Sequence, residues 1–199
     1  MTAQPGAAVA AGAALLERAL GYTRGALALV TPAHLDARTP CERWRLAELL
    51  AHMDDSLTAL HDAAATATVA LAPAPSTAAD DELPAVASLR SRGCGLLGAW
   101  SRLGADQRVS VGGRALPASV IAVAGALEVA VHGWDVARAC GDQRALPDGL
   151  AVVLLGHAPA LVTPADRGRR FAEPVVVPDR CSPSDHLLAF TGRAPDWEP

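Results

Sequence analysis

The chain has 199 residues, of which 51% are hydrophobic, and its formal net charge is −4 at pH 7. This length predicts a single domain with enough apolar residues for a sizeable core. All seventeen basic residues are arginine and they form no basic cluster, so we expect no nucleic-acid partner. The four cysteines are widely spaced and include no Cys-x-x-Cys pair, which favours reduced thiols in the cytoplasm.

The apolar stretches do not predict insertion into a membrane. The alanine-rich N-terminus lacks a positively charged start and is interrupted by Glu17 and Arg18, so we expect no signal peptide. The run from Val120 to Val131 is too short to span a bilayer. We therefore expect a cytoplasmic protein, monomeric or homodimeric, that does not bind membranes.

Hydrophobic periodicity predicts four substantial helices, over residues 8–30, 45–66, 83–103 and 117–140. The second helix carries leucines and Met53 at helical spacing. The fourth begins at Pro117 and is almost wholly apolar over its first two thirds, which indicates a helix buried on most sides. Four such helices predict an all-α four-helix bundle over residues 1–141.

The remaining segments predict loops and an extension. Proline and alanine over residues 70–83 predict a loop, and residues 107–113 predict a short extended segment or turn. Residues 142–199 predict a C-terminal extension with a short helix over 148–161 and an extended Val-Val-Val-Pro piece. A second short helix should start near Pro183, with Ser182 as its N-cap.

After its almost wholly apolar first part, the fourth helix carries polar groups at Glu128, His132, Asp135 and Arg138. At the helical angle per residue, the first three share a stripe about 60° wide. An ionised glutamate in so apolar a helix is costly unless it is paired or bound to a metal. Glu-x-x-x-His places a carboxylate and an imidazole one turn apart, as two ligands of one metal ion require. The same two side chains could instead only hydrogen-bond each other in the core.

His52 lies at the edge of the buried stripe of the second helix and is the natural third ligand. Bundles commonly build metal sites from side chains on facing helices. Three protein ligands with an open position are typical of catalytic zinc, with nickel or iron as other possibilities. His52 also separates the alternatives, because a purely structural Glu128–His132 pair does not require it nearby. Taken alone, His52 could be a boundary histidine bonded to solvent or to Glu48.

Four further residues are candidates for orienting the ligands or contacting a substrate: Asp55, Ser56, Asp135 and Arg138. Asp55 and Asp135 could equally be ordinary surface carboxylates. For Asp55, which lies about 100° from Ser56 around the helix, that interpretation is favoured. Arg138 could meet an anionic substrate or serve as a structural ion-pair partner.

Three segments together resemble the DinB-like domain family. They are TPCERWRLAELLAHM, LEVAVHGWDVARACG and FAEPVVVPDRCSPSDHLLAFTGRAPDW. The nearest branch is the N-terminal domain of mycothiol-dependent maleylpyruvate isomerase and its single-domain actinobacterial relatives. The likeness spans about residue 31 to residue 197.

This resemblance implies a metal site and a chemistry. In the family a divalent metal, usually zinc, is held by a histidine of the second helix and by the Glu and His of the Glu-x-x-x-His segment, which match His52, Glu128 and His132. The resemblance also implies a transferase or isomerase that uses a thiol, usually mycothiol, on a small electrophilic molecule. Arg45 departs from the family, which usually has Ser or Thr as the cap there. The sequence also has no counterpart of the full isomerase's separate C-terminal domain, so maleylpyruvate is not the expected substrate.

Other functions remain open at this stage. The same site could serve a metal-dependent hydrolase or lyase that uses no thiol. A non-catalytic module that binds a metal or a small molecule is a third hypothesis, because a metal site does not establish turnover.

Overall fold

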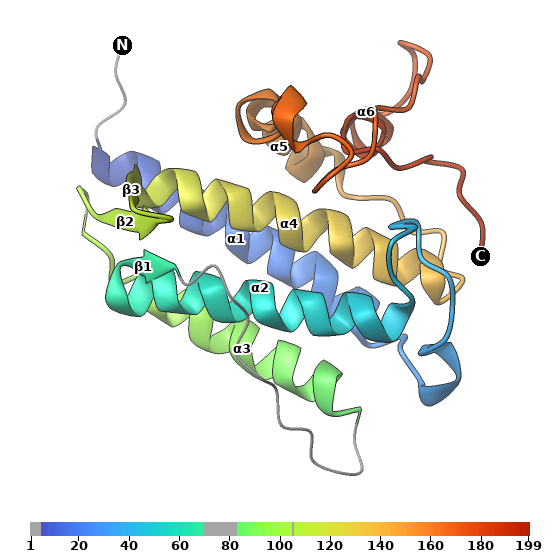
Figure 1. Ribbon diagram of the computed structural model, residues 1–199, viewed down its shortest axis with the longest axis horizontal. Helices are drawn as coiled ribbons and strands as arrows, with labels where there is room; N and C mark the ends of the chain where they lie inside the picture. The colour runs from blue at the N-terminus through green and yellow to red at the C-terminus, as the bar shows by residue number, and fades with distance from the viewer. Residues whose placement is uncertain (1–4, 70–82, 105) are drawn as a thin grey trace.

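The computed structural model describes residues 5–69, 83–104 and 106–199. Within these residues the chain is mainly helical, and the predicted all-α bundle is confirmed (Figure 1). Its four long helices are α1 (Pro5–Leu27), α2 (Leu46–Thr66), α3 (Pro84–Trp100) and α4 (Ala118–Ala139). Two single-turn 3-10 helices, η1 (Pro32–His34) and η2 (Pro164–Asp166), lie in the connections. The predicted loop over 70–83 lies outside the described residues except for its last position.

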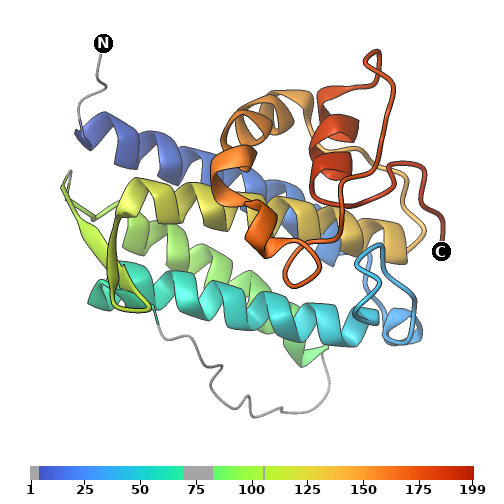
Figure 2. The same cartoon turned by 45° about the horizontal axis from the view of Figure 1, so that its top comes forward.

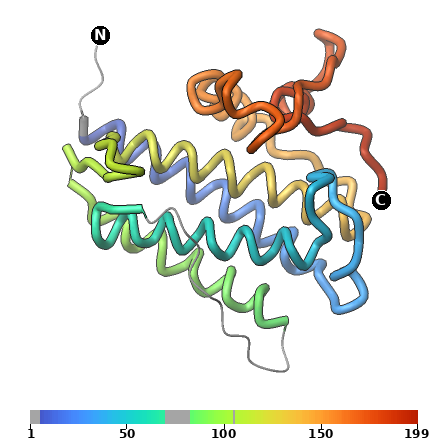
Figure 3. Tube along the Cα trace, viewed as in Figure 1, coloured from blue at the N-terminus to red at the C-terminus, as the bar shows by residue number. Residues whose placement is uncertain are grey.

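The bundle closes in the order α1, α4, α2, α3. Helix α1 packs against α4 and α3, and α2 packs against α3 and α4. The trace in Figure 3 shows α1 and α4 running in one direction and α2 and α3 in the other. This arrangement places the first half of α2 beside the second half of α4, where the predicted ligands lie.

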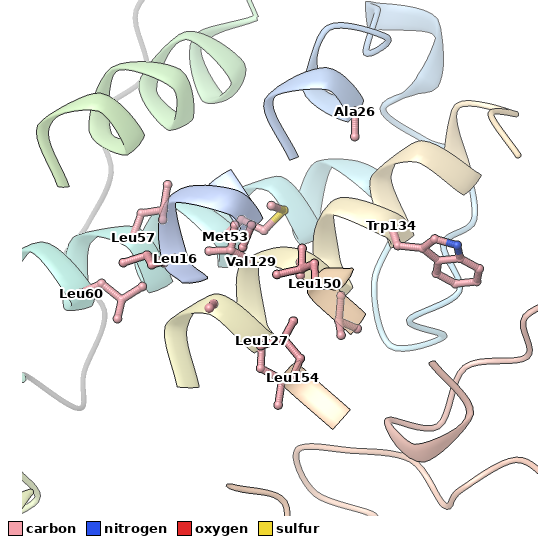
Figure 4. Close-up of a cluster of buried hydrophobic side chains, with 14 of the residues drawn as sticks. Leu16, Ala26, Met53, Leu57, Leu60, Leu127, Val129, Trp134, Leu150 and Leu154 are labelled. Atoms are coloured by element: carbon pink, nitrogen blue, oxygen red, sulfur yellow. The ribbon is translucent and has the colours of Figure 1, made fainter. Parts of the chain in front are cut away.

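Helix α4 is the central element of the core. Leu60 of α2 and Leu127 and Val129 of α4 belong to the buried cluster shown in Figure 4. Among the described residues, α4 alone is long and apolar enough to cross a membrane, but 78% of its most apolar window is buried inside the protein. That burial is what the core helix of a folded bundle shows, and it confirms the prediction that α4 is covered on most sides.

A small sheet closes one end of the bundle. Strands β2 (Arg108–Val111) and β3 (Arg114–Pro117) form an antiparallel hairpin, and β1 (Thr68–Val69) pairs in parallel with β2. Gly112 and Gly113 both have positive φ, at 55° and 78°, as a tight two-residue hairpin turn requires. The predicted extended segment therefore continues into a second strand. For the same reason α4 begins at Ala118, and Pro117 ends a strand instead of starting the helix.

The C-terminal extension packs over α4 (Figure 2). It contains α5 (Asp148–Leu161) and α6 (Pro183–Phe190), which contact each other, and α5 also contacts α4. The predicted cap of α6 is confirmed, since the Asp185 backbone N–H donates to Ser182 Oγ at 3.1 Å. The extension thereby covers the part of α4 that carries the polar stripe.

Candidate metal centre

His52, Glu128 and His132 meet between α2 and α4. His52 Nε2 lies 2.7 Å from Glu128 Oε1, although 76 positions separate the two residues. His132 Nε2 lies 3.3 Å from the same oxygen. One ligand atom from each side chain lies within 4.8 Å of the other two. A core hydrogen bond between Glu128 and His132 alone would not require His52 to approach, so the geometry favours a three-ligand site.

Asp135 fixes the orientation of His132. The imidazole Nδ1–H donates to Asp135 Oδ2 at 2.9 Å, which directs Nε2 towards Glu128. The Asp135 carboxylate is fully buried and is itself paired with Arg193, whose Nη2 lies 2.9 Å from Oδ2. Arg193 also donates to the Thr191 carbonyl at 2.8 Å, which holds the guanidinium in place. A carboxylate–histidine pair of this kind is the usual support of a metal-binding imidazole.

The charges of the site stabilise one another. Burial by itself raises the pKa of Glu128, but His132 and the hydrogen bonds from both imidazoles hold that pKa well below its usual range. Burial by itself lowers the pKa of His132, but Glu128 and Asp135 outweigh it and raise the pKa to about 9. Burial also works against an ionised Asp135, and Arg193 is the main group that keeps its pKa low. In the metal-free protein, protonated His132 therefore supplies the positive charge beside Glu128 that a metal ion would supply.

The triad opens into a pocket of about 200 Å³. His52, Glu128 and His132 form part of its lining, beside Trp44, Leu127 and Val131. The Trp44 and His52 rings are 4.3 Å apart between centroids, so the indole covers one side of the imidazole. Side chains of His52 and Glu128 remain 33% and 27% exposed, which leaves the site accessible to a small molecule.

The other predicted residues divide into two groups. Ser56 donates to Glu128 Oε1 at 3.3 Å, so it joins Asp135 in contacting the triad. Asp55 is partly buried and does not line the pocket. Arg138 does not line it either. Its guanidinium lies 4.9 Å from the Trp134 ring centroid and donates to the Pro195 carbonyl, which fits a structural role.

Sequence reasoning missed the residues that approach the triad from outside α2 and α4. They are Cys41, Arg43 and Trp44, which precede α2, and Arg169, Arg170, Phe171 and Arg193 of the C-terminal extension. Their positions depend on how the extension folds back over the bundle. A signal for Arg193 existed in the sequence, since it lies in the Gly-Arg-x-Pro segment that carries part of the family resemblance.

The donor set fits a divalent metal. Two imidazole nitrogens and one carboxylate oxygen are a known catalytic zinc set, in which a fourth position stays open. Zinc bonds to these atoms are about 2.0–2.2 Å long, and small side-chain rotations would bring the three atoms to one centre. The group could therefore hold a metal ion.

The family model for the mycothiol maleylpyruvate isomerase N-terminal domain matches residues 16–137. The chain belongs to this family. The matched range includes the whole triad, Ser56 and Asp135, and it ends before the extension that supplies Arg193. The domain is of the general DinB-like class, as the sequence resemblance predicted.

Two curated relatives share part of the chain. They are the uncharacterized proteins MT0763 and Rv0738 of Mycobacterium tuberculosis, each 43% identical to this chain over 68 residues. Each match covers 33% of this chain and 37% of the relative, so the chain spans little more than a third of their length. No solved structure gives a significant match.

Proposed function

We propose that the protein is a metal-dependent enzyme that transfers a thiol to a small electrophilic molecule, or isomerises such a molecule with a thiol as partner. Zinc is the expected metal, with nickel or iron as alternatives, and mycothiol is the expected thiol. The observation that carries the proposal is the convergence of His52 on the Glu128–His132 pair. The mycothiol-related family supports the choice of thiol.

Each side chain of the site has a definite task in this proposal. Glu128 supplies a ligand that is already ionised, and Asp135 keeps His132 Nε2 aimed at the shared centre. Trp44, Leu127 and Val131 form an apolar wall that limits the water around the reacting atoms. A bound metal would add Lewis acidity, which deprotonates a coordinating thiol and holds its thiolate for attack.

The proposal also includes a cytoplasmic location, where mycothiol-type thiols and protein cysteines stay reduced. Cys41, Cys94, Cys140 and Cys181 are all free, which supports it.

The thiol can be tested before the electrophile is known. Protein loaded with Co²⁺ should develop a thiolate-to-cobalt charge-transfer band when mycothiol is added. His132→Ala should abolish the band, whereas His61→Ala should retain it, because His61 is exposed and paired only with Asp62 at 3.9 Å.

The reaction itself is tested with a panel of small electrophiles. Consumption of each electrophile is measured with and without mycothiol, and with and without zinc. Turnover that is equally fast without any thiol would refute the thiol part of the proposal.

A further inference from the structure

The pocket beside the triad carries more positive charge than its own acidic groups balance. Glu128 is the one carboxylate in its lining, which includes four arginines: Arg43, Arg169, Arg170 and Arg193. Asp135 neutralises Arg193 from behind the pocket. Three guanidinium groups therefore remain to be accounted for, and a divalent cation at the triad would add to their charge.

Arg169 and Arg170 are presented by a short hydrogen-bonded loop. The backbone N–H groups of Arg170 and Phe171 donate to the Asp166 carbonyl at 2.9 and 3.1 Å. Gly168 turns the chain with φ at 71°, and its N–H donates to the Phe171 carbonyl at 2.8 Å. These bonds define the backbone of the loop, so both arginines leave it at fixed positions beside the pocket.

The loop leaves Arg169 without a carboxylate partner and gives Arg170 only one solvent-exposed ion pair. The Asp166 carboxylate accepts from the Thr163 N–H and hydroxyl at 2.9 and 2.7 Å. Arg170 pairs with the second oxygen of Asp166 at 3.4 Å, but its side chain is 71% exposed, so solvent screens this ion pair and leaves the guanidinium available to a ligand. Arg169 has no carboxylate within ion-pair distance in the described part of the chain.

Arg43 links the loop to the segment that precedes α2. Its guanidinium donates to the Arg169 carbonyl and lies 5.6 Å from the Trp44 ring centroid. It also lacks a carboxylate partner in residues 5–69, 83–104 and 106–199. Three arginines from two separate segments thus line the same pocket as the triad.

We propose that Arg43, Arg169 and Arg170 form an anion-binding subsite for a small oxyanion, of which a carboxylate is the test case. A ligand selected by this subsite carries the oxyanion at one end and reacts at the triad with its other end. The assignment of a reacting end to the triad rests on the proposed function. Planar guanidinium groups bind carboxylates through paired, charge-assisted hydrogen bonds, and several of them around one pocket suit such a ligand. Arg169 and Arg170 lie beyond the residues that the family model matches, so this selectivity belongs to the extension.

The test compares dicarboxylates with their monomethyl esters. Succinate, glutarate and adipate are titrated by calorimetry into zinc-loaded and into metal-free protein, each beside its ester. The ester keeps one carboxylate for the triad and removes the one assigned to the arginines. The variants are Arg169→Gln/Arg170→Gln and, as a control with the same change of charge, Arg114→Gln/Arg180→Gln. Arg114 and Arg180 are exposed and lie outside this pocket.

In the wild type, at least one dicarboxylate should bind about tenfold more tightly than its ester. The preference should nearly vanish in Arg169→Gln/Arg170→Gln, persist in the control, and weaken with added salt. The subsite would be overturned if Arg169→Gln/Arg170→Gln preferred the dicarboxylate as strongly as the wild type does. It would also be overturned if the wild type showed no preference for the dicarboxylate over its ester. The proposed function fails separately: if zinc does not bind but metal-free protein keeps the arginine-dependent preference, the subsite stands without the metal centre.

Two sources of the carboxylate are distinguished by a second titration. If the group belongs to the electrophile, zinc-loaded protein that holds the neutral thiol 2-mercaptoethanol should retain the dicarboxylate preference. If it belongs to the thiol, 3-mercaptopropionate should bind more tightly than 2-mercaptoethanol, and only while the loop arginines are present. Independence of both results from Arg169 and Arg170 would contradict the proposal.

Discussion

At the scale of single residues, His132 is the most constrained member of the site. Its side chain is 7% exposed, with Glu128 Oε1 at 3.3 Å on one side and Asp135 Oδ2 at 2.9 Å on the other. These two carboxylates raise its pKa to about 9. A metal ion needs the neutral imidazole, so binding must displace the proton.

Metal affinity should consequently rise with pH. Below about pH 9 each unit of pH should change the apparent affinity by about tenfold, because one proton leaves His132 for each metal bound. The stability of the metal-free protein should change with pH in the opposite direction. A histidine with a raised pKa contributes its full stabilisation below about pH 6.5, and that contribution is lost as the pH rises through 9. Competition with a chelating dye at pH 6, 7 and 8 measures the first effect, and a flat profile would contradict it.

Asp135 should matter for metal binding although it is not a ligand. Asp135→Asn weakens the acceptor of the His132 Nδ1–H bond, and loss of such a partner typically costs about 10–100-fold in metal affinity. Asp55→Asn is the matched control, because Asp55 does not line the pocket. Circular dichroism must show both variants folded at the temperature used, since Asp135 also balances buried Arg193. Equal affinities in the two variants would contradict the assigned role.

The three ligands could be predicted from sequence because helical spacing determines which side chains share a face. Glu128 and His132 follow from one turn of α4, and His52 follows from its place at the edge of the buried stripe of α2 and from the family resemblance. Trp44 and Arg193 could not be placed in this way. They lie in irregular segments whose position is set by packing against the finished bundle, which local periodicity does not describe.

At the scale of elements, α4 depends on close contact with α1. A Cβ built on Gly133 would lie 2.9 Å from the Thr23 Cβ and 3.1 Å from the Thr23 Cα, and it would collide with the Thr23 hydroxyl. That hydroxyl donates to the Val129 carbonyl at 2.8 Å, so it has little freedom to move away. The contact fixes α4 against α1 at the residue that follows His132.

Gly133→Ala should therefore destabilise the fold by about 1–3 kcal/mol, the usual cost of overpacking a core. Gly21→Ala on α1 provides the control, because nothing lies within 4 Å of the added Cβ. It should stabilise the protein by up to about 1 kcal/mol through helix propensity. Urea denaturation of both variants measures the two values, and the same sign for both would contradict the packing argument.

The helices could be predicted because their apolar spacing is regular, and the hairpin could be predicted only in part. Residues 107–113 contain the Gly-Gly turn, but Arg114–Pro117 does not alternate between apolar and polar residues. Its pairing with β2 and the parallel addition of β1 come from the ends of α2 and α4, which the bundle brings together.

At the scale of the whole molecule, the extension and the bundle build one site. The bundle supplies the triad, and the extension supplies Arg193 behind it and Arg169 and Arg170 beside it. A ligand that binds this site should therefore stabilise both parts together.

Zinc at about a thousand times its dissociation constant should raise the free energy of unfolding by about 4 kcal/mol. For a chain of this size that corresponds to a rise in melting temperature of roughly 10 °C. His52→Ala should lose most of this shift, whereas His186→Ala should keep it, since His186 lies on α6, outside the pocket, and hydrogen-bonds to the Asp179 carbonyl. Equal shifts in the two variants would mean that zinc binds elsewhere.

The most direct test of the central claim is the metal content of protein purified without a chelating tag. Elemental analysis should find about one divalent metal ion, with zinc the most abundant, for each chain of wild type and of His61→Ala. His52→Ala, Glu128→Gln and His132→Ala should each contain far less. Absence of metal from the wild type even after incubation with zinc, or a content unchanged by His52→Ala, would contradict the claim that these three residues hold a metal.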